Sequence, residues 1–441
     1  MPYRVALVNL GCPKNEVDGQ VMLGLLEQAG FEVTGDPDAA DVLLVNTCGF
    51  IAAAEEESVD AILAAARRKE AGGRVLVVAG CLAQRHGAEL LAALPEVDAV
   101  VGTGYVPAIA DLVRRALSGE RVLAVGEPGY RYDRVLPRRT TGPRHVAYLK
   151  IAEGCDNRCT YCTIPFLRGR YRSRPLEVVL EEARELAARG ARELVLVAQD
   201  TTRYGLDLYG RPRLAELLRV LARLDDVCWV RVLYGHPAYL TPDVLAVMAE
   251  EPRVCRYLDL PLQHAHPDVL RRMGRRGSPE ELLRLVADIR AAVPGVVLRT
   301  TFMVGFPGET EEHFRVLRDF AAAARFERAG VFAFSPEEGT PAARFPDQVP
   351  EEVREERRRE LLKLQWRLSL IRNRSLVGRV LHVMVDGRTR GGLYFGRTEG
   401  DAPEVDGRVY FRAGTSPVPG SVVRVRITRG YPYDLAGVAE P

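Results

Sequence analysis

The sequence contains very few lysines for its length. Its 441 residues include only Lys14, Lys69, Lys150 and Lys363, and arginine supplies the rest of the positive charge. We interpret this as a bias of genome composition rather than a functional feature. Lysine and arginine together number 61 against 59 acidic residues, so the net charge is +2. An overall polycation is therefore excluded, and any basic surface for a partner must be local.

Long apolar segments are also missing. No run of about 18 apolar residues occurs, so the sequence predicts no membrane span. The apolar stretch 4–10 is too short for the core of a secretion signal and is expected to be a strand. We therefore expect a cytoplasmic protein in a reducing compartment. Structural disulfides are rare there, and clustered cysteines are more often metal ligands or redox groups.

The chain is too long for one ordinary core, and we expect an α/β protein of two or three domains. Residues 1–125 alternate apolar strands with helices, which predicts a parallel sheet covered on both faces. Residues 126–145 are rich in proline, glycine and arginine, as is typical of a linker. Alternation resumes over 146–370 with about six strands, which favours an open or partial (β/α) barrel. Residues 371–441 have short strands and glycine turns, which predict a small all-β barrel.

Three cysteines lie within eight residues in the segment EGCDNRCTYCTI. Cys155, Cys159 and Cys162 follow the first strand predicted for the central region. A structural zinc site usually takes four protein ligands, and no fourth cysteine or histidine lies nearby in the sequence. Three unpaired core thiols are the other ordinary interpretation. An iron–sulfur cube also takes thiolate ligands, and three of them leave one iron open for chemistry.

Polar groups follow two apolar strands of the central region, where the rim of a barrel would lie. These groups are Gln199, Asp200, Gln263 and His264. A single histidine at such a place is more often a structural group than a ligand. Gly305 and Gly308 come after a strand and before a helix, where glycine lets the backbone approach a ligand closely. On the glycine spacing alone, an ordinary strand–turn–helix corner is the favoured interpretation.

Three further cysteines, Cys12, Cys48 and Cys81, are far apart in the sequence. Each lies at or within two residues of the end of an apolar strand, and each precedes a helix. The carboxyl ends of parallel strands share one edge, so the thiols would face one crevice if their strands are neighbours. Nearby helix N-termini favour the thiolate form. Two interpretations remain open, namely buried thiols, the more frequent by residue type, and a second cluster with an open iron.

The CxxxCxxC motif, with Tyr161 before its last cysteine, resembles the signature of the radical S-adenosylmethionine (SAM) enzymes. The chain also has three N-terminal cysteines and a small C-terminal β domain. With these features it resembles the radical SAM methylthiotransferase family over essentially its whole length. The resemblance implies a [4Fe-4S] cluster on Cys155, Cys159 and Cys162. Its open iron would chelate SAM, and its electron would cleave SAM to a 5′-deoxyadenosyl radical. The resemblance also implies a second [4Fe-4S] cluster on the N-terminal cysteines, which would hold the sulfur for the substrate.

The same resemblance assigns the other candidates to a SAM pocket. Residues 301–312, TFMVGFPGETEE, are similar to the segment that contacts the adenine in this superfamily. One SAM would donate a methyl group and another would form the radical. An electron donor, such as a flavodoxin-type protein, is the expected redox partner. The implied cofactor-binding residues are Tyr161, Gln199, Asp200, His264, Gly305 and Gly308.

Two branches of the family differ in their substrate. One modifies a purine in the anticodon loop of tRNA, and the other the β-carbon of an aspartate in ribosomal protein S-twelve. The segments similar to the ribosomal branch are LGCPKNEVDGQ (10–20), VAQDTTRYG (197–205) and YPYDLAG (431–437). Small departures lie at Gly19, Gln20 and 235–236, and bear on the substrate side. We expect the ribosomal-protein enzyme; the alternatives are a tRNA-modifying enzyme and a non-catalytic iron–sulfur protein that binds RNA.

The C-terminal region resembles a TRAM domain, a β-barrel often linked to RNA. Residues 371–441 contain eleven arginines, no lysine and seven acids, a net charge of +4. Charge and stacking would suit RNA, but the barrel would equally dock a protein loop, and strand aromatics are more often core. The charged helix expected over 350–378 favours a solvated face rather than a binding stripe. The strand aromatics are Tyr394, Phe395, Tyr410 and Phe411.

Overall fold

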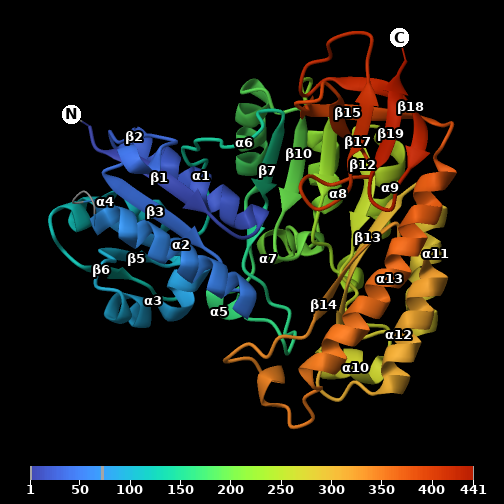
Figure 1. The fold of residues 1–441 in the computed structure, drawn as a ribbon, viewed down its shortest axis with the longest axis horizontal. Helices are drawn as coiled ribbons and strands as arrows, with labels where there is room; N and C mark the ends of the chain where they lie inside the picture. Colours follow the sequence, from blue (N-terminus) through green and yellow to red (C-terminus); the bar gives the residue numbers. More distant parts are fainter. Residues whose placement is uncertain (1, 71–73, 441) are drawn as a thin grey trace.

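The fold was obtained as a computed structural model that describes residues 2–70 and 74–440 (Figure 1). An N-terminal α/β module lies beside a larger central sheet with its helices. A small barrel sits at one end of that sheet, at the top of Figure 1. The α/β fold class with a C-terminal barrel is therefore confirmed. No helix in the described ranges combines the length and the apolar character needed to cross a bilayer.

The N-terminal sheet is parallel, with strand order β2-β1-β3-β4-β5-β6. Helices α1 and α4 cover one face, and α2 and α3 cover the other. All of β3 is buried, which explains its unbroken apolar sequence. The strands are β1 (Arg4–Asn9), β2 (Glu32–Val33), β3 (Val42–Thr47), β4 (Val75–Gly80), β5 (Ala99–Val101) and β6 (Val122–Ala124). The helices are α1 (Pro13–Gln28), α2 (Ala52–Glu70), α3 (Cys81–Ala93) and α4 (Ile109–Leu117).

The central sheet is also parallel, and its strand order β7-β10-β11-β12-β13-β14 follows the sequence. Each strand–helix–strand unit thus adds beside the previous one, which gives an open partial barrel. The strands are β7 (Val146–Lys150), β10 (Glu193–Val197), β11 (Trp229–Val232), β12 (Val254–Asp259), β13 (Val297–Val304) and β14 (Arg328–Ala333). The covering helices are α6 (Leu176–Ala188), α8 (Leu214–Leu221), α9 (Pro242–Glu250), α11 (Pro279–Ala292) and α12 (Glu311–Ala324).

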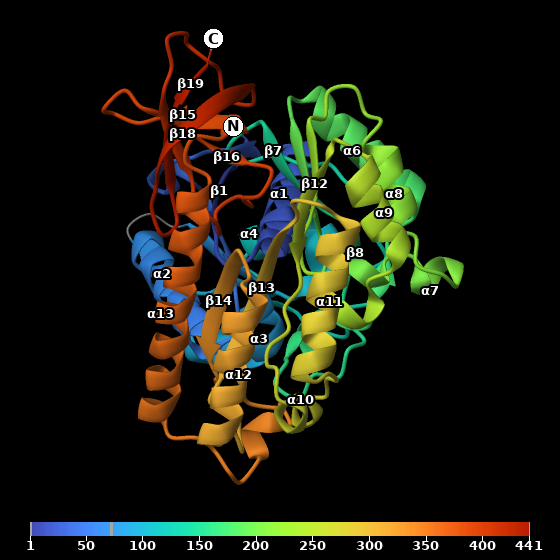
Figure 2. The same ribbon diagram turned by 90° about the vertical axis from the view of Figure 1, so that its right-hand side faces the viewer.

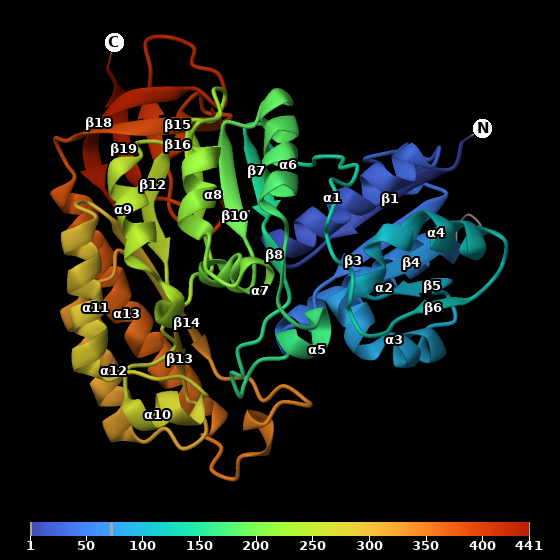
Figure 3. The same cartoon turned by 180° about the vertical axis from the view of Figure 1, so that it is seen from behind.

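Short elements carry the loops at the rim of the central sheet. Figure 3 shows α5 between the central sheet and the N-terminal module, where it contacts α3. These elements are β8 (Ala152–Glu153), α5 (Ile164–Arg168), β9 (Arg172–Ser173), α7 (Leu206–Tyr209) and α10 (Pro267–Arg272). Short 3-10 helices lie at Pro37–Ala39, Thr103–Ala108, Thr201–Arg203, Pro237–Tyr239 and Ala342–Arg344.

One strand differs from the sequence prediction. The apolar run 257–262 predicts a strand, but β12 begins at Val254 and ends at Asp259. The ladder does not continue because Pro261 has no N–H to donate, and Gln263, with a φ of +72°, forms only an isolated bridge to Phe302. The residues after Asp259 therefore form rim structure instead of continuing the strand.

The C-terminal barrel is closed in the order β15-β16-β17-β19-β18. Tyr394 and Phe411 stack inside it with ring centroids 5.8 Å apart, and both are buried. These two aromatics therefore serve the barrel core rather than a surface. Helix α13 (Glu351–Ser375) joins the central sheet to the barrel and stands beside α12 (Figure 2). The barrel strands are β15 (Val380–Arg388), β16 (Tyr394–Thr398), β17 (Val409–Arg412), β18 (Val422–Gly430) and β19 (Leu435–Ala439).

Candidate functional site

Cys12, Cys48 and Cys81 meet at the carboxyl edge of the N-terminal sheet. Their strands β1, β3 and β4 are neighbours, and Cys12 precedes α1 while Cys81 begins α3. Gly11 has a φ of +90°, and a Cβ there would lie 2.9 Å from the Cβ of Cys48. Burial raises the pKa of Cys48 to about 11, and the charges of Cys81 and Cys12 add to the rise. The structure thus brings the three distant cysteines together.

Two cations flank this N-terminal triad. The Arg168 guanidinium donates from Nη2 to Sγ of Cys81 at 3.4 Å. Burial opposes ionisation, but the charges of Lys14 and Arg168 hold the pKa of Cys12 below its usual value. At Cys81, burial outweighs Arg168 and raises the pKa. The triad therefore has one thiol poised to ionise, beside cations that would stabilise further thiolates.

Arg168 belongs to a buried network of charges between the two modules. Its Nη1 donates to Asp18 at 2.7 Å and to Glu153 at 3.1 Å. Lys150 donates to Glu153 at 2.6 Å and also to Asp18. Burial opposes ionisation of Glu153, but Lys150 and Arg168 lower its pKa to about 2. The network joins α1 of the N-terminal module to β7, β8 and α5 of the central module.

Cys155, Cys159 and Cys162 form the second triad in the loop after β8. Cys155 donates its backbone N–H to the carbonyl of Gly169 at 3.1 Å, and Cys162 donates to Cys159 at 3.1 Å. Burial raises the pKa of Cys155 to about 11 and that of Cys162 to about 12. The neutral thiols of Cys155 and Cys162 are therefore favoured unless a positive group, such as a metal centre, draws off their protons.

Backbone contacts hold this loop from two sides. Thr160 donates to the carbonyl of Met273 at 3.1 Å and, through Oγ1, to that of Arg272 at 2.8 Å. Ala342 donates to the carbonyl of Thr160 at 2.9 Å. The loop thus lies between the end of α10 and the segment before α13, which fixes its thiols without the help of a disulfide.

The spacing of the sulfur atoms tests what each triad would hold. In the described ranges, one group of three metal-ligand atoms lies within 4.8 Å, and it is His266, Asp268 and His313 rather than either cysteine triad. A zinc ion, with Zn–S bonds of about 2.3 Å, would hold its thiolates about 3.8 Å apart. Neither triad has its three sulfur atoms within 4.8 Å of one another in this structure, and a set of thiol donors suits a larger group such as an iron–sulfur cube.

The histidine group has a simpler explanation. His266 accepts from the backbone N–H of Asp268 at 3.2 Å, and His313 accepts from that of Thr310 at 3.3 Å, in both cases through Nδ1. These bonds satisfy the free N–H groups at the starts of α10 and α12. The residues at this group therefore serve helix capping.

Tyr161 connects the cysteine loop to the segment 301–312. Its hydroxyl accepts from Nη1 of Arg275 at 3.1 Å, and its ring meets Phe306 edge-on with centroids 6.4 Å apart. Pockets that bind small molecules commonly have volumes of about 300–1,000 Å³. The cavity beside Cys159 measures about 530 Å³, and Arg275 also lines it. Arg275 thus links Tyr161 to a cavity at the second triad.

Gln199 and Asp200 have different surroundings at the end of β10. Both side-chain atoms of the Gln199 amide are buried and have no hydrogen-bond partner within the described residues. Such an amide is costly to bury unless a ligand or water satisfies it. Asp200 instead accepts from Asn157 at 2.9 Å and from Thr202 at 2.6 Å. Gln199 is therefore the residue that a ligand would complete, and Asp200 supports the cysteine loop through Asn157.

His264 is fully buried behind the rim. Its Nδ1 accepts from the backbone of His266 at 2.9 Å, and its Nε2 lies 3.3 Å from a carboxylate oxygen of Glu309. The other oxygen of Glu309 accepts from the N–H of Gly305 at 2.9 Å. His264 is thereby tied to the 301–312 segment. Its assignment to SAM binding stays a prediction, and these contacts give it a supporting position.

The two glycines of that segment adopt backbone conformations that favour glycine. Gly305 has a φ of +69° and Gly308 a φ of +80°. A Cβ on Gly305 would clash with the side chain of Arg354, and one on Gly308 with Arg272 at 2.6 Å. In the direction of each missing Cβ, an arginine side chain packs against the glycine, so the backbone does not face an open cavity there. Their roles in SAM binding also stay predictions.

The charge network was not foreseen from the sequence. Asp18, Glu153 and Arg168 carry no local pattern, since their partners lie on other elements. Lys150 offered the one signal of this kind in the sequence. It lies near the end of the apolar stretch HVAYLKI, and a lysine buried there needs a partner of opposite charge. The structure shows that this partner lies partly in another module.

Family comparisons cover each part of the chain. Residues 4–102 match the uncharacterized protein family UPF0004, residues 149–321 the radical SAM superfamily, and residues 377–439 the TRAM domain. The ribosomal protein uS12 methylthiotransferase RimO of Pelotomaculum thermopropionicum is 54% identical over 440 residues, which cover 99% of each chain. The RimO of Desulforudis audaxviator is 56% identical over 98% of this chain and 96% of its own.

This chain belongs to the RimO family. It is accordingly an enzyme of the radical SAM class, in a family that uses SAM and [4Fe-4S] clusters. Among solved structures, the radical SAM methyltransferase TsrM from Kitasatospora setae has a TM-score of 0.57 at 20% identity, over 78% of this chain and 77% of that chain. The cobalamin-dependent radical SAM enzyme OxsB has a TM-score of 0.50 at 12% identity, over 82% of this chain and 56% of that chain. These two likenesses concern the fold alone.

Proposed function

We propose that the protein attaches a methylthio group to the β-carbon of an aspartate in ribosomal protein uS12. The observation that carries this proposal is the pairing of two cysteine triads across one interface. Arg168 follows one triad by six residues and contacts a cysteine of the other. A single residue thus joins a site of radical chemistry to a site that presents sulfur.

In this proposal each triad holds one [4Fe-4S] cluster and leaves one iron without a protein ligand. Cys155, Cys159 and Cys162 are the ligands of one cluster, and Cys12, Cys48 and Cys81 are those of the other. When bound, the first cluster supplies the electron that cleaves SAM, and the second supplies the sulfur. The thiol donors that the two triads offer support these ligand sets.

The chain's own residues bind and orient the reactants. Gln199 has two unsatisfied amide atoms to offer SAM, and Tyr161 holds Arg275, which lines the cavity beside Cys159. Asp200, through Asn157, keeps the cysteine loop in place. Arg168 offsets negative charge at Cys81 while it holds the modules together. His264, Gly305 and Gly308 complete the proposed cofactor-binding set from behind the rim.

The same proposal includes the setting of the reaction. We infer domain limits of 1–125, 126–145, 146–370 and 371–441, an electron donor such as a flavodoxin-type protein, and action in the cytoplasm on uS12 or the small ribosomal subunit. Contact with RNA through the C-terminal region belongs to this setting, because the substrate is a protein of the ribosome.

The test is a reaction of the reconstituted protein with SAM, sulfide, a reductant and either uS12 or tRNA. We expect uS12 to gain the mass of one methylthio group in place of a hydrogen atom, localised to an aspartate by peptide mass spectrometry. A gain on tRNA adenosine with none on uS12 would reject this substrate. Failure to form 5′-deoxyadenosine from SAM would favour a non-catalytic iron–sulfur protein.

A further inference from the structure

Lys14 is a buried cation without an acidic partner at the interface of the N-terminal and central modules. It is the second residue of α1 and is 7% exposed. Lys69 and Lys150 each pair with a carboxylate, at 2.7 Å and 2.6 Å. Among the described residues the Lys14 ammonium group has no ion pair, and its contact is the ring of Tyr234, whose centroid lies 3.3 Å from Nζ. A charge is costly to bury unless it is paired, so Lys14 is suited to receive an anion.

The other cation at the N-terminal triad is already paired. Arg168 forms ion pairs with Asp18 at 2.7 Å and with Glu153 at 3.1 Å, and both carboxylates are buried. An anion from outside would have to displace these bonds to reach the Arg168 guanidinium. Of the two cations beside this triad, Lys14 is therefore the one that a ligand can use.

Tyr234 is held against Lys14 by contacts with neighbouring strands. Its φ of +60° is unfavourable for a residue with a side chain, and residues kept in such conformations gather at ligand sites. Its backbone N–H donates to Asp259 at 3.0 Å, and its carbonyl accepts from the N–H of Thr201 at 3.0 Å. Asp259 also forms an ion pair with Arg299 at 3.7 Å, so this acid is engaged elsewhere. The rim of the central sheet thus keeps an aromatic face against the Lys14 ammonium group.

Lys14 and Tyr234 lie between the two sites of the proposed reaction. Lys14 follows Cys12 by two residues, and its charge acts on the Cys12 thiol. Tyr234 follows β11 at the carboxyl rim of the central sheet, one strand along from Gln199 after β10. Figure 1 shows α1 beside β7, and the two elements are in contact. A ligand at Lys14 would therefore lie next to both the N-terminal triad and the rim of the central sheet.

We propose that Lys14 binds the side-chain carboxylate of the substrate aspartate and thereby selects an acidic residue as the acceptor. The inference rests on the proposed function, in which the carbon that receives sulfur is bonded directly to the carboxylate carbon. An ammonium group two residues from Cys12 holds that reacting carbon beside the triad that presents sulfur. A neutral purine base would leave Lys14 buried and unpaired, and sites reject substrates that leave their polar groups unpaired. Lys14 makes and breaks no covalent bond, and its role is to determine specificity.

The preference of the reconstituted protein for the carboxylate tests this role. The anisotropy of fluorescein-labelled uS12 gives the affinity for the native form and for a form with its target aspartate changed to asparagine, with reductant left out. We expect the wild type to prefer the aspartate form about tenfold or more, because asparagine cannot make the charge-assisted hydrogen bond. K14M keeps a side chain of similar length without its charge and should bind both forms equally. K14R keeps the charge and should retain part of the preference.

Two further measurements distinguish this role from a structural one. K363M, which removes an exposed lysine of α13, is the matched control and should behave as the wild type. With reductant, K14M should show a KM for native uS12 about tenfold higher, while its iron content and its formation of 5′-deoxyadenosine from SAM stay unchanged. Because the preference is a ratio of affinities within one variant, a lower yield of folded K14M does not alter it.

The outcomes separate this inference from the proposed function. Equal affinity of the wild type for both forms of uS12, or an undiminished preference in K14M, would overturn the role of Lys14 while modification of uS12 still stands. Loss of N-terminal iron in K14M, with its preference for aspartate intact, would assign Lys14 to the cluster instead. If the wild type modifies tRNA and not uS12, the proposed function fails, and the assignment of Lys14 to an aspartate fails with it.

Discussion

The two cysteine triads are held in place by different parts of the chain. Cys155, Cys159 and Cys162 share one loop, where main-chain bonds and the ends of neighbouring helices fix them. The N-terminal triad is collected from three strands, and the ring of charge around it includes Arg168 from another module. A local motif can thus form its site inside one module, whereas the dispersed triad depends on how two modules dock.

Replacing a cysteine in each triad gives the largest expected effect. C159A and C48A should each lose about four of about eight irons, because in the proposed function each triad holds its own cluster. C159A should abolish formation of 5′-deoxyadenosine, whereas C48A should retain it and lose only transfer to uS12. Iron analysis and chromatography of the products measure both. Equal iron content in C48A and the wild type would remove the N-terminal cluster from the proposal.

Arg168→Gln tests whether the N-terminal triad depends on the other module. The substitution removes the ion pairs of Arg168 with Asp18 and Glu153, which then keep their pairs with Lys150. Breaking a buried ion pair lowers the free energy of unfolding by about 3–5 kcal/mol. We expect a lower urea midpoint and selective loss of N-terminal iron. The control R139Q removes a half-exposed pair with Glu27 and should cost at most about 1 kcal/mol. Equal losses in both variants would mean that the network adds nothing to docking.

The pH dependence of alkylation should separate Cys12 from Cys162 in the metal-free protein. Both residues are partly exposed. Desolvation raises the pKa of each thiol, but the charges of Lys14 and Arg168 bring that of Cys12 below its usual value, whereas the pKa of Cys162 rises to about 12. The thiolate is the reactive form, so Cys12 should react first as the pH rises, below the usual thiol range, and Cys162 far above it. Peptide mass spectrometry after iodoacetamide treatment follows each site. The reverse order would show that Lys14 and Arg168 do not set the charge at this triad.

Asp200→Asn gives the smallest expected effect, confined to the local triad. Asn157 and Thr202 donate to different oxygens of Asp200, and asparagine keeps an oxygen for only one of these bonds. The loss of one hydrogen bond costs about 1 kcal/mol, or a few-fold in affinity. We expect a few-fold higher KM for SAM and unchanged iron in both triads. N-terminal iron loss in this variant would contradict the independence of the two sites.

Much of the architecture followed from patterns in the sequence. Continuous apolar strands between helices predicted the parallel sheets, and the glycine-punctuated C-terminal strands predicted the barrel. The CxxxCxxC motif predicted one triad because its ligands are neighbours in the chain. Strand order was not accessible, so the convergence of Cys12, Cys48 and Cys81 remained one of two interpretations until β1, β3 and β4 were seen side by side.

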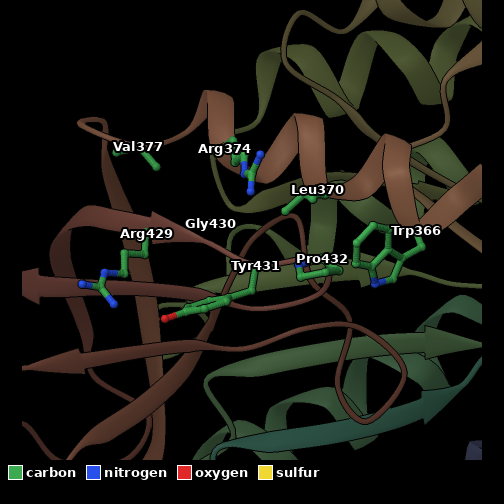
Figure 4. Close-up of a pocket in the computed structure, with 8 residues that line it drawn as sticks. All are labelled: Trp366, Leu370, Arg374, Val377, Arg429, Gly430, Tyr431 and Pro432. Carbon is green, nitrogen blue, oxygen red and sulfur yellow. The ribbon is translucent and has the colours of Figure 1, made fainter.

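Other features lacked a local pattern altogether. The partners of Arg168 and Lys150 lie on elements far away in the sequence, and no periodicity reports such pairs. The aromatics Tyr394 and Phe411 proved to be core, while Trp366 and Tyr431, from α13 and the β18–β19 turn, line an exposed groove (Figure 4). Whether a strand aromatic faces inward depends on how the barrel closes.

The sequence by itself determined the chemistry of this protein, because thiol spacing within one loop and apolar periodicity are properties of neighbouring residues. The tertiary structure alone decided which charges meet at the module interface and which aromatics reach the surface. Those contacts depend on the docking of surfaces that are separated by hundreds of residues, and burial then fixes their energy.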